Sequence, residues 1–421
     1  MERAVLVGAP LRGVEERAVN EHMEELHRLT ETAGGRVVGS LIQRLDVPAA
    51  QTYIGKGKVG ELRELVEARS ADLVIFDDEL KPDQAKNLED ALGVRVMDRS
   101  ELILDIFASR ARTRESKLQV ELAQLEYLLP RLARMWTHLS RIRGGIGLRG
   151  PGETQIETDR RLINRRISEL RRKLKSVAEA RATQRKRRRG EYRVALVGYT
   201  NAGKSSILRA LSGDDLFVED RLFATLDSTT RTVDVGAGYT ALITDTVGFI
   251  RKLPHHLVAS FRSTLEEARE ADLLLHVVDA SHPEWEEQKR VVQGVLSDLE
   301  LDGQPQLLVF NKVDRLTHQE EEAFRTRVRA FDSTPSIFTS ATETSGLDSL
   351  VEALRARVRK RYPRVEVELS AADGELIAAL HREGEVLDQR GNGTRIQLVA
   401  RIPESLLGRL RQEPEVTLVE A

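Results

Sequence analysis

The spacing of apolar residues changes along the chain and predicts four regions. Over residues 1–108, short apolar runs alternate with amphipathic stretches, a pattern typical of parallel strands joined by helices. The predicted strands are Ala4–Val7, Val37–Leu45, Asp72–Phe76 and Val94–Met97. The predicted helices are Glu15–Thr32, Gly60–Ser70 and Pro82–Leu92. We therefore expect this region to form a small parallel α/β domain.

The second region, residues 109–190, follows a heptad period. Apolar residues recur at alternating spacings of four and three residues over 118–139 and again over 163–177, which predicts two helices. Pro130 should kink the first helix or remove one of its hydrogen bonds. A glycine-rich connector, residues 143–152, separates the two runs, so we expect an antiparallel helical hairpin with a mobile tip. A plain helical arm that links two domains explains the pattern equally well.

The last two regions return to alternating strands and helices. Residues 191–363 contain predicted strands at Val194–Gly198, Ala241–Asp245, Leu273–Asp279 and Gln306–Asn311. Residues 364–421 predict the order β-α-β-β-α-β, which is a small α+β domain. The fold class expected for the chain is therefore α/β and multidomain, with a helical hairpin between two α/β domains and the small domain last.

The composition is that of a globular protein, with 40% hydrophobic and 31% charged residues among 421. No apolar run approaches the roughly 20 residues of a membrane-spanning helix. The chain contains no cysteine, which excludes disulfides, thiolate metal sites and cysteine nucleophiles. The first residues run directly into an apolar strand without the pattern of a signal peptide, so we expect a cytoplasmic protein.

The net charge of −2 conceals an uneven distribution. Residues 160–189 hold fourteen Lys and Arg residues against two Glu, a local charge of +12 that leaves −14 for the remainder. A basic stretch of this kind is often only a solvated helix face. It is also the charge pattern that binds nucleic-acid phosphates, so a nucleic-acid partner stays open.

A phosphate-binding motif begins the third region. Residues 198–205, Gly-Tyr-Thr-Asn-Ala-Gly-Lys-Ser, match G-x-x-x-x-G-K-[ST] between a predicted strand and a predicted helix. In this setting, backbone N–H groups converge on phosphate oxygens at the N-terminus of the helix. Lys204 is predicted to reach the β- and γ-phosphates, and the Ser205 hydroxyl is predicted to bind Mg²⁺.

Three further elements follow in a fixed order. Asp245 and Gly248 belong to a D-x-x-G element, in which the Asp can hold Mg²⁺ through water and the Gly N–H can sense a γ-phosphate. Asp314 ends an N-K-x-D element, and its carboxylate can accept both N1–H and N2–H₂ of guanine. Adenine offers no such donor pair, and a buried carboxylate that faced it would stay unpaired. Residues 339–341, Thr-Ser-Ala, can place a backbone N–H against guanine O6.

These elements, in this order and spacing, resemble the translation-factor-related GTPase superfamily. The resemblance implies a switch threonine that binds Mg²⁺ and closes over the γ-phosphate. Among Thr225, Thr229 and Thr230 we choose Thr225, because residues 223–227 are similar to the Phe-Ala-Thr-Leu-Asp element of related GTPases. The resemblance implies catalytic roles for Lys204, Thr225 and Gly248, and Mg²⁺ ligation by Ser205, Thr225 and Asp245. The implied nucleotide contacts are Gly198, Tyr199, Thr200, Asn201, Ala202, Gly203, Lys204, Ser205, Phe223, Ala224, Thr225, Leu226, Asp227, Asp245, Thr246, Val247, Gly248, Asn311, Lys312, Val313, Asp314, Thr339, Ser340 and Ala341.

One position departs from the pattern of Ras-like enzymes. These enzymes carry a Gln that orients water directly after the D-x-x-G glycine, whereas this chain has Phe249. The chain thus resembles the hydrophobic-substituted GTPases, and we expect slow intrinsic hydrolysis that depends on a partner or an extra cation. Asn201 resembles the position that ligates K⁺ in some of these enzymes. The alternative is an Asn that only shapes the loop.

Two segments of the first half resemble the HflX family of GTPases. They are residues 53–62, Tyr-Ile-Gly-Lys-Gly-Lys-Val-Gly-Glu-Leu, and residues 147–161, Gly-Leu-Arg-Gly-Pro-Gly-Glu-Thr-Gln-Ile-Glu-Thr-Asp-Arg-Arg. The order of the domains is similar too. The resemblance implies a monomer that binds the large ribosomal subunit and its rRNA, hydrolyses GTP to GDP under stimulation by the ribosome, and splits stalled or idle ribosomes, notably under heat stress. The arginines expected to meet rRNA phosphates are Arg143, Arg149, Arg160, Arg161, Arg165, Arg166, Arg171 and Arg172.

Other functions stay open at this point. A ribosome-assembly GTPase or RNA chaperone would share the same chemistry but bind immature particles. A third hypothesis is a switch in which GTP only toggles binding and hydrolysis is incidental. Residues 55–60 also fit G-x-G-x-x-G, but no buried strand directly precedes them, so we reject a dinucleotide site. An ATP site in the N-terminal region stays open, although no phosphate loop there supports it.

Overall fold

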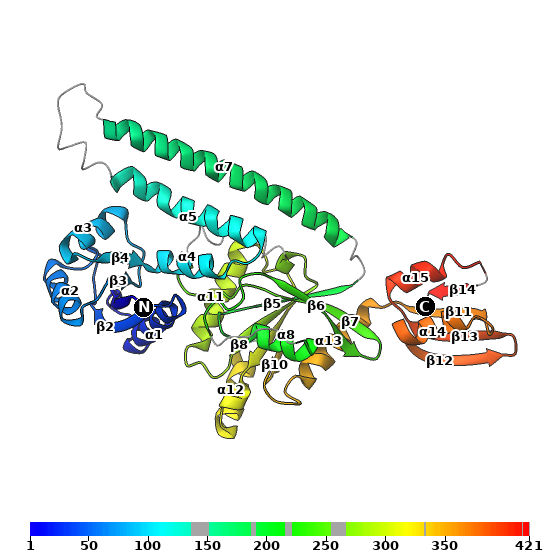
Figure 1. Ribbon diagram of the computed structural model, residues 1–421. Coiled ribbons are helices and arrows are strands. Elements are labelled where there is room, and N and C mark those ends of the chain that lie inside the picture. Colours follow the sequence, from blue (N-terminus) through cyan, green and yellow to red (C-terminus); the bar gives the residue numbers. More distant parts are fainter. Residues whose placement is uncertain are drawn as a thin grey trace. The chain divides into compact units, whose positions relative to one another are not determined.

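The computed structural model describes residues 1–135, 151–186, 191–214, 221–253, 267–331, 334–414 and 416–420 (Figure 1). The chain divides into two compact units. Unit 1 comprises Met1–Arg181, Glu219–Asp227 and Ile250–Ser263, and unit 2 comprises Ala182–Val218, Ser228–Phe249 and Thr264–Ala421. The four-domain division expected from the sequence stays a prediction. No helix in the described ranges is long and apolar enough to cross a membrane.

Unit 1 contains a four-stranded parallel sheet with the strand order β2-β1-β3-β4. The strands are β1 (Arg3–Gly8), β2 (Arg36–Ile42), β3 (Leu73–Phe76) and β4 (Arg95–Asp98). The helices are α1 (Glu16–Thr32), α2 (Lys56–Arg69), α3 (Pro82–Leu92) and α4 (Arg99–Arg110). Contacts between α2 and α3 and between α1 and α4 show which helices lie together on the sheet. The predicted parallel α/β arrangement is confirmed.

Helix α4 is absent from the sequence-based prediction. Asp98, the last residue of β4, caps this helix because its carboxylate accepts a hydrogen bond from the backbone N–H of Glu101 at 2.9 Å. Ile103 and Phe107 are fully buried or nearly so. An Asp followed three residues later by a Glu is a helix-start signal that the sequence carries. The run of apolar residues that follows makes the helix hard to recognise, because a largely buried helix lacks a clear polar face.

The helical hairpin consists of α5 (Arg114–Met135) and α7 (Pro151–Lys186), and α7 belongs to unit 1 as far as Arg181. The two helices run in opposite directions, as predicted (Figure 1). Leu118, Leu122, Ile167 and Leu170 form the buried centre of their interface. Pro130 lies inside α5, which continues past it to Met135. The predicted glycine-rich tip, residues 143–152, lies almost wholly outside the described residues.

Unit 2 contains a six-stranded sheet with the order β10-β9-β8-β5-β7-β6, parallel except for β6, which is antiparallel to β7. The strands are β5 (Tyr192–Gly198), β6 (Thr229–Gly236), β7 (Tyr239–Asp245), β8 (Leu273–Asp279), β9 (Gln306–Asn311) and β10 (Ser336–Phe338). The helices are α8 (Lys204–Ser212), α11 (Trp285–Asp298), η1 (Val313–Arg315), α12 (His318–Phe331) and α13 (Asp348–Arg361). Residues of α8 and α13 share one core cluster with the central strands. Trp285 of α11 and Phe324 of α12 pack with a second cluster.

The end of unit 2 is an antiparallel sheet with the order β12-β13-β11-β14 and two helices. Its elements are β11 (Arg364–Ser370), α14 (Gly374–Glu383), β12 (Glu385–Asn392), β13 (Arg395–Arg401), α15 (Glu404–Leu410) and β14 (Thr417–Glu420). The predicted order β-α-β-β-α-β is confirmed. Buried Leu, Val, Ile and Ala side chains from the strands and both helices form one core.

Candidate nucleotide site

The loop between β5 and α8 is shaped by two glycines. Gly198 has φ +154° and Gly203 has φ +98°, a region of backbone conformation that side chains disfavour. A Cβ at Gly198 would lie 2.3 Å from the carbonyl O of Val277, and one at Gly203 would lie 2.1 Å from Nδ2 of Asn311. The motif glycines are therefore required by both conformation and space.

Lys204, the first residue of α8, is buried within this loop. Its Nζ donates hydrogen bonds to the carbonyl O of Gly198 at 3.1 Å and of Tyr199 at 2.9 Å. Burial lowers the pKa of Lys204 to about 8, although the nearby Asp245 opposes this shift. The protein thus holds an ammonium group in an environment that disfavours its charge, and an anion at this place would stabilise it.

The side chains of Ser205 and Asp245 meet at the carboxyl end of β7. Ser205 Oγ donates to Asp245 Oδ2 at 2.6 Å, and Asp245 is almost fully buried. A hydroxyl and a carboxylate are hard oxygen ligands of the kind that Mg²⁺ prefers. Within the described ranges, no group of three or more His, Asp or Glu residues could hold a metal on its own. The donor set therefore fits an ion that takes its remaining ligands from phosphate and water.

The D-x-x-G element lies directly against the phosphate-binding loop. The backbone N–H of Phe249 donates to Gly198 O at 3.0 Å, and the N–H of Thr200 donates to Phe249 O at 2.7 Å. A Cβ at Gly248 would lie 2.7 Å from Thr200 Cα and 3.0 Å from Lys204 Nζ. Phe249, which replaces the water-orienting Gln of Ras-like enzymes, is only 2% exposed. Its backbone is thus fastened to the loop, and its ring is inside the protein.

The N-K-x-D element reaches the same loop from β9. Asn311 Nδ2 donates to Ala202 O at 3.0 Å, and Lys312 Nζ donates to Asn201 O at 2.8 Å. Asn201 has φ +61°, and Lys312 also forms an ion pair with Asp279 at 2.7 Å. The left-handed backbone of Asn201 by itself favours an Asn there, so a K⁺ ligand at this residue stays a prediction.

The exposure of Asp314 differs from what the sequence argument assumes. The selectivity argument assumes a buried carboxylate, but Asp314 is exposed on the short helix η1. The turn after β9 places this residue at the surface, so only a bound base could shield the carboxylate from water. The base selectivity that the sequence argument assigns to Asp314 stays a prediction.

The backbone hydrogen bonds of residues 339–341 show which N–H group could donate to guanine O6. The N–H of Thr339 donates to Phe310 O at 2.8 Å, and the N–H of Ser340 donates to Gly346 O at 3.1 Å. In the described part of the chain, the N–H of Ala341 donates to no group. Ala341 is therefore the member of this segment whose N–H is available to a ligand.

The segment proposed to contain the switch threonine belongs to unit 1. The carboxylate of Asp227 accepts hydrogen bonds from Thr113 Oγ1 at 2.6 Å, from Thr113 N at 3.2 Å and from Arg112 N at 3.1 Å, next to the start of α5. The ring of Phe223 packs edge-on against Phe107 of α4, with centroids 4.7 Å apart. Both side chains thus contact the N-terminal half. Their roles as nucleotide contacts stay predictions.

The three candidate threonines occupy different settings. Thr229 and Thr230 lie in β6, where they pair with Asp245 and Thr244 of β7. Thr225 lies outside the strands, in the segment of unit 1 that ends at Asp227. The structure does not bring Thr225 and the pair of Ser205 and Asp245 into one unit, so their shared Mg²⁺ site stays a prediction.

The arginines predicted to meet RNA fall into three groups. Arg166 binds both carboxylate oxygens of Glu121, at 2.6 and 2.9 Å, and Arg171 binds Glu126 at 2.8 Å, so both fasten α7 to α5. Arg143 and Arg149 lie outside the described residues. The four that are exposed on α7 and form no ion pair with an acidic side chain in the described ranges are Arg160, Arg161, Arg165 and Arg172.

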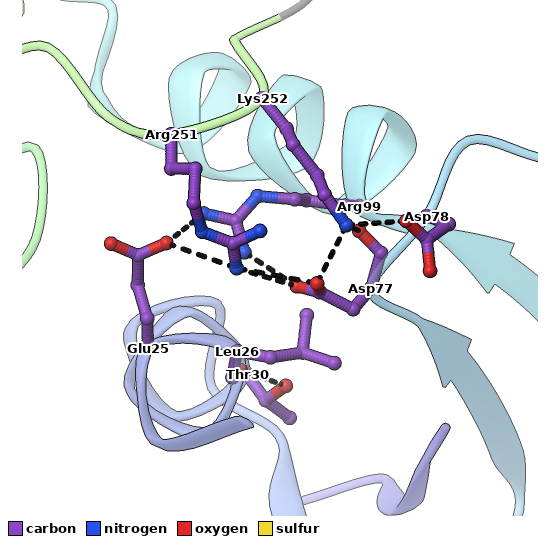
Figure 2. Close-up of polar contacts among 8 residues, drawn as sticks. All are labelled: Glu25, Leu26, Thr30, Asp77, Asp78, Arg99, Arg251 and Lys252. Atoms are coloured by element: carbon purple, nitrogen blue, oxygen red, sulfur yellow. Dashed lines mark hydrogen bonds and ion pairs between the residues drawn. The ribbon is translucent and has the colours of Figure 1, made fainter. Parts of the chain in front are cut away.

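The structure also joins residues that the sequence analysis missed. Arg251 and Lys252, three and four residues after the last glycine of the D-x-x-G element, form ion pairs with Asp77 after β3 (Figure 2). The two partners are 174 residues apart or more, and no local pattern links them. The only signal in the sequence is a pair of acidic residues, Asp77 and Asp78, at the carboxyl end of a buried strand.

The sheet of unit 2, the loop from β5 into α8 and the N-K-x-D segment define the class of protein: the chain contains a P-loop GTPase domain. Sequence models of three families match, described as GTP-binding GTPase N-terminal over residues 20–108, GTP-binding GTPase middle region over 110–188 and 50S ribosome-binding GTPase over 193–312.

Similar proteins give the family. The chain is 53% identical to "GTPase HflX" of Alkalihalophilus pseudofirmus over 75% of each chain. It is 46% identical to that of Caldanaerobacter subterraneus over 96% of this chain and 93% of the relative, and 45% identical to that of Magnetococcus marinus over 100% and 96%. The chain belongs to the HflX family of GTPases, as the resemblance predicted, and it is an enzyme that hydrolyses GTP.

Proposed function

We propose that this GTPase binds the large ribosomal subunit and splits stalled or idle ribosomes, with GTP hydrolysis stimulated by the ribosome. The observation that carries the proposal is the row of exposed arginines on α7, Arg160, Arg161, Arg165 and Arg172, in a chain whose GTPase domain matches a family described as 50S ribosome-binding. Exposed guanidinium groups on a helical hairpin can pair with rRNA phosphates without reading base sequence.

The buried geometry of the phosphate-binding loop supports a nucleotide-binding role for it. Lys204 would exchange the carbonyl oxygens of Gly198 and Tyr199 for phosphate oxygens, which are stronger acceptors. Ser205, Asp245 and Thr225 would hold Mg²⁺, which supplies positive charge against the phosphates when it is bound. The N–H of Gly248 would contact the γ-phosphate.

The base is proposed to lie between the N-K-x-D element and residues 339–341. Asp314 would accept the two N–H donors of guanine, and Ala341 N–H would donate to guanine O6. Asn311 and Lys312 would act through the loop that they already fasten. Phe249 cannot orient water, so the proposal includes slow hydrolysis in the free protein and faster hydrolysis on the ribosome.

The test is GTP turnover of the full chain with and without large ribosomal subunits, over a range of salt concentrations. We expect stimulation that falls as salt rises, because phosphate contacts release counterions. The variant R161Q/R165Q should lose most of the stimulation and keep the basal rate. The matched control is R36Q/R329Q, which removes two exposed arginines elsewhere.

An absence of stimulation by large subunits would overturn the ribosomal part of the proposal. Equal loss in R36Q/R329Q would show that overall charge, and not the α7 surface, is responsible. Stimulation by immature particles in place of mature subunits would favour the ribosome-assembly alternative.

A further inference from the structure

The carboxyl end of the N-terminal sheet is where an α/β sheet usually binds its ligand. The strands are parallel, but the order in which the chain adds them, β2-β1-β3-β4, reverses between β1 and β3. Ligands of such sheets bind at this reversal, beyond the carboxyl ends of the strands. Asp77 follows β3 directly at this place and is only 4% exposed. A buried carboxylate needs charged or hydrogen-bonding partners.

Its partners come from the segment after the D-x-x-G element and from α4. Arg251 lies with a guanidinium nitrogen 3.3 and 3.2 Å from the two carboxylate oxygens of Asp77, and Lys252 Nζ lies 2.9 Å from Oδ2 (Figure 2). Arg99 of α4 donates to Oδ1 of Asp77 at 2.8 Å. Burial alone would raise the pKa of Asp77, but Arg99, Arg251 and Lys252 outweigh it and lower the pKa to about 2.

Residues 251–252 supply two of the three cations that contact the Asp77 carboxylate, and Arg99 supplies the third. Arg99 also contacts Glu25, and Lys252 also contacts Asp78 (Figure 2). Without the segment, this buried carboxylate would lose two of its three cationic partners, which is strongly unfavourable.

We propose that the carboxyl end of the N-terminal sheet is a docking site for the chain's own segment after the D-x-x-G element, with Asp77 as the residue that positions Arg251 and Lys252. Docking holds this segment in an arrangement that opposes the binding of GTP more than that of GDP. The expected difference between GTP and GDP binding rests on the proposed nucleotide site.

The reason for the difference between GTP and GDP lies two residues before Ile250. A methyl group at Gly248 would be only 3.0 Å from Lys204 Nζ, and the Phe249 backbone is hydrogen-bonded to Gly198 and Thr200. A γ-phosphate held by both Gly248 N–H and Lys204 must lie between them, so the two groups must separate. Because residues 251–252 follow in the same short stretch of chain, their docking resists this movement. GDP lacks the γ-phosphate, so its binding does not require Gly248 and Lys204 to separate.

The test compares the affinities of the full chain for GDP and for a non-hydrolysable GTP analogue. D77N and R251Q should each raise the affinity for the GTP analogue at least fivefold relative to GDP, which is within the usual range of coupling between sites. The double variant D77N/R251Q should give no larger change than either single variant, because both remove the same interaction. Backbone hydrogen exchange of residues 246–253 should become faster in D77N.

Several controls keep the outcome clear. E64Q, an exposed carboxylate on α2, should leave the affinity ratio unchanged. Circular dichroism confirms that each variant folds, and if D77N does not fold, R251Q and the half-exposed K252Q decide the matter, with a smaller shift expected for K252Q. An affinity ratio within twofold of the parent protein in the folded variants would overturn the docking proposal. Failure of the parent protein to bind either nucleotide would instead overturn the proposed nucleotide site.

Discussion

The two buried charges at Lys204 and Asp77 differ in how the protein treats them. Lys204 faces backbone carbonyls, and burial lowers its pKa to about 8, which favours the neutral form. Asp77 faces three cationic side chains, and they lower its pKa to about 2, which favours the charged form. A charge that the protein stabilises poorly is suited to a ligand, whereas a charge that it stabilises well is suited to holding its own chain.

The largest effect is expected from removal of the first charge. K204A should weaken GTP and GDP binding on the order of 100-fold, since it removes two charge-assisted hydrogen bonds worth roughly 1.5–3 kcal/mol each. Equilibrium titration with fluorescent nucleotides measures this. The control K117A removes an exposed lysine at the start of α5 and should bind normally. Equal binding by K204A and K117A would show that the Lys204 ammonium group does not bind the nucleotide.

Removal of the second charge should act on stability. The pKa of Asp77 lies at about 2 in the folded protein against 3.8 for the ordinary side chain, which corresponds to roughly 2 kcal/mol of unfolding free energy at pH 7. D77N should lose about this amount in urea unfolding, with E64Q unchanged.

The pH dependence follows from the lowered pKa. A depressed carboxyl pKa contributes stability that is fully present above about pH 4 and is lost as the pH falls through about 2. The difference between the parent protein and D77N should therefore shrink over this window. A constant difference from pH 7 to pH 2 would mean that the charge of Asp77 is not the cause.

An exposed charge should give a smaller and more specific effect. D314N should lower the preference for GTP over xanthosine triphosphate about tenfold, because an amide can donate to the extra carbonyl of xanthine where a carboxylate cannot. Competition binding measures the ratio, and D348N, an exposed Asp on α13, is the control. Unchanged selectivity in D314N would refute the assignment of the base site.

The smallest effect concerns the other segment that contacts the N-terminal half. T113A removes the 2.6 Å hydrogen bond from the Thr113 hydroxyl to Asp227 and the 3.1 Å hydrogen bond that this oxygen accepts from the backbone N–H of Ser116. It should cost about 1 kcal/mol of stability. Proteolysis near residues 221–227 should become faster by the factor that corresponds to this free energy. T32A, which removes an exposed hydroxyl bonded only within its own helix, should leave this proteolysis unchanged. Equal proteolysis in all three proteins would show that the contact to Asp227 contributes little.

The parts of the molecule that follow local patterns could be predicted from the sequence. Gly198, Gly203 and Lys204 have the spacing that the loop requires, and the apolar runs of β8 and β9 match their strands to the residue. Strand β6 was missed because Thr and Arg fill its first positions, although Val233 and Val235 alternate as buried residues.

The ion pairs of Asp77 could not be predicted from one sequence. Such contacts join residues 174 or more apart, and their geometry depends on how two distant segments of the chain pack together. For Asp314, the motif predicted the position in the chain, but the sequence did not predict that the side chain would be exposed.

The proposed function requires that GTP binding to this chain drives the splitting of ribosomes. Intact ribosomes should be incubated with the full chain and GTP, a non-hydrolysable GTP analogue or GDP, with K204A as the control, and then sedimented through a sucrose gradient. We expect separated subunits with GTP and with the analogue, and intact ribosomes with GDP or K204A. Ribosomes that stay intact with GTP at saturating protein would show that this protein does not split them.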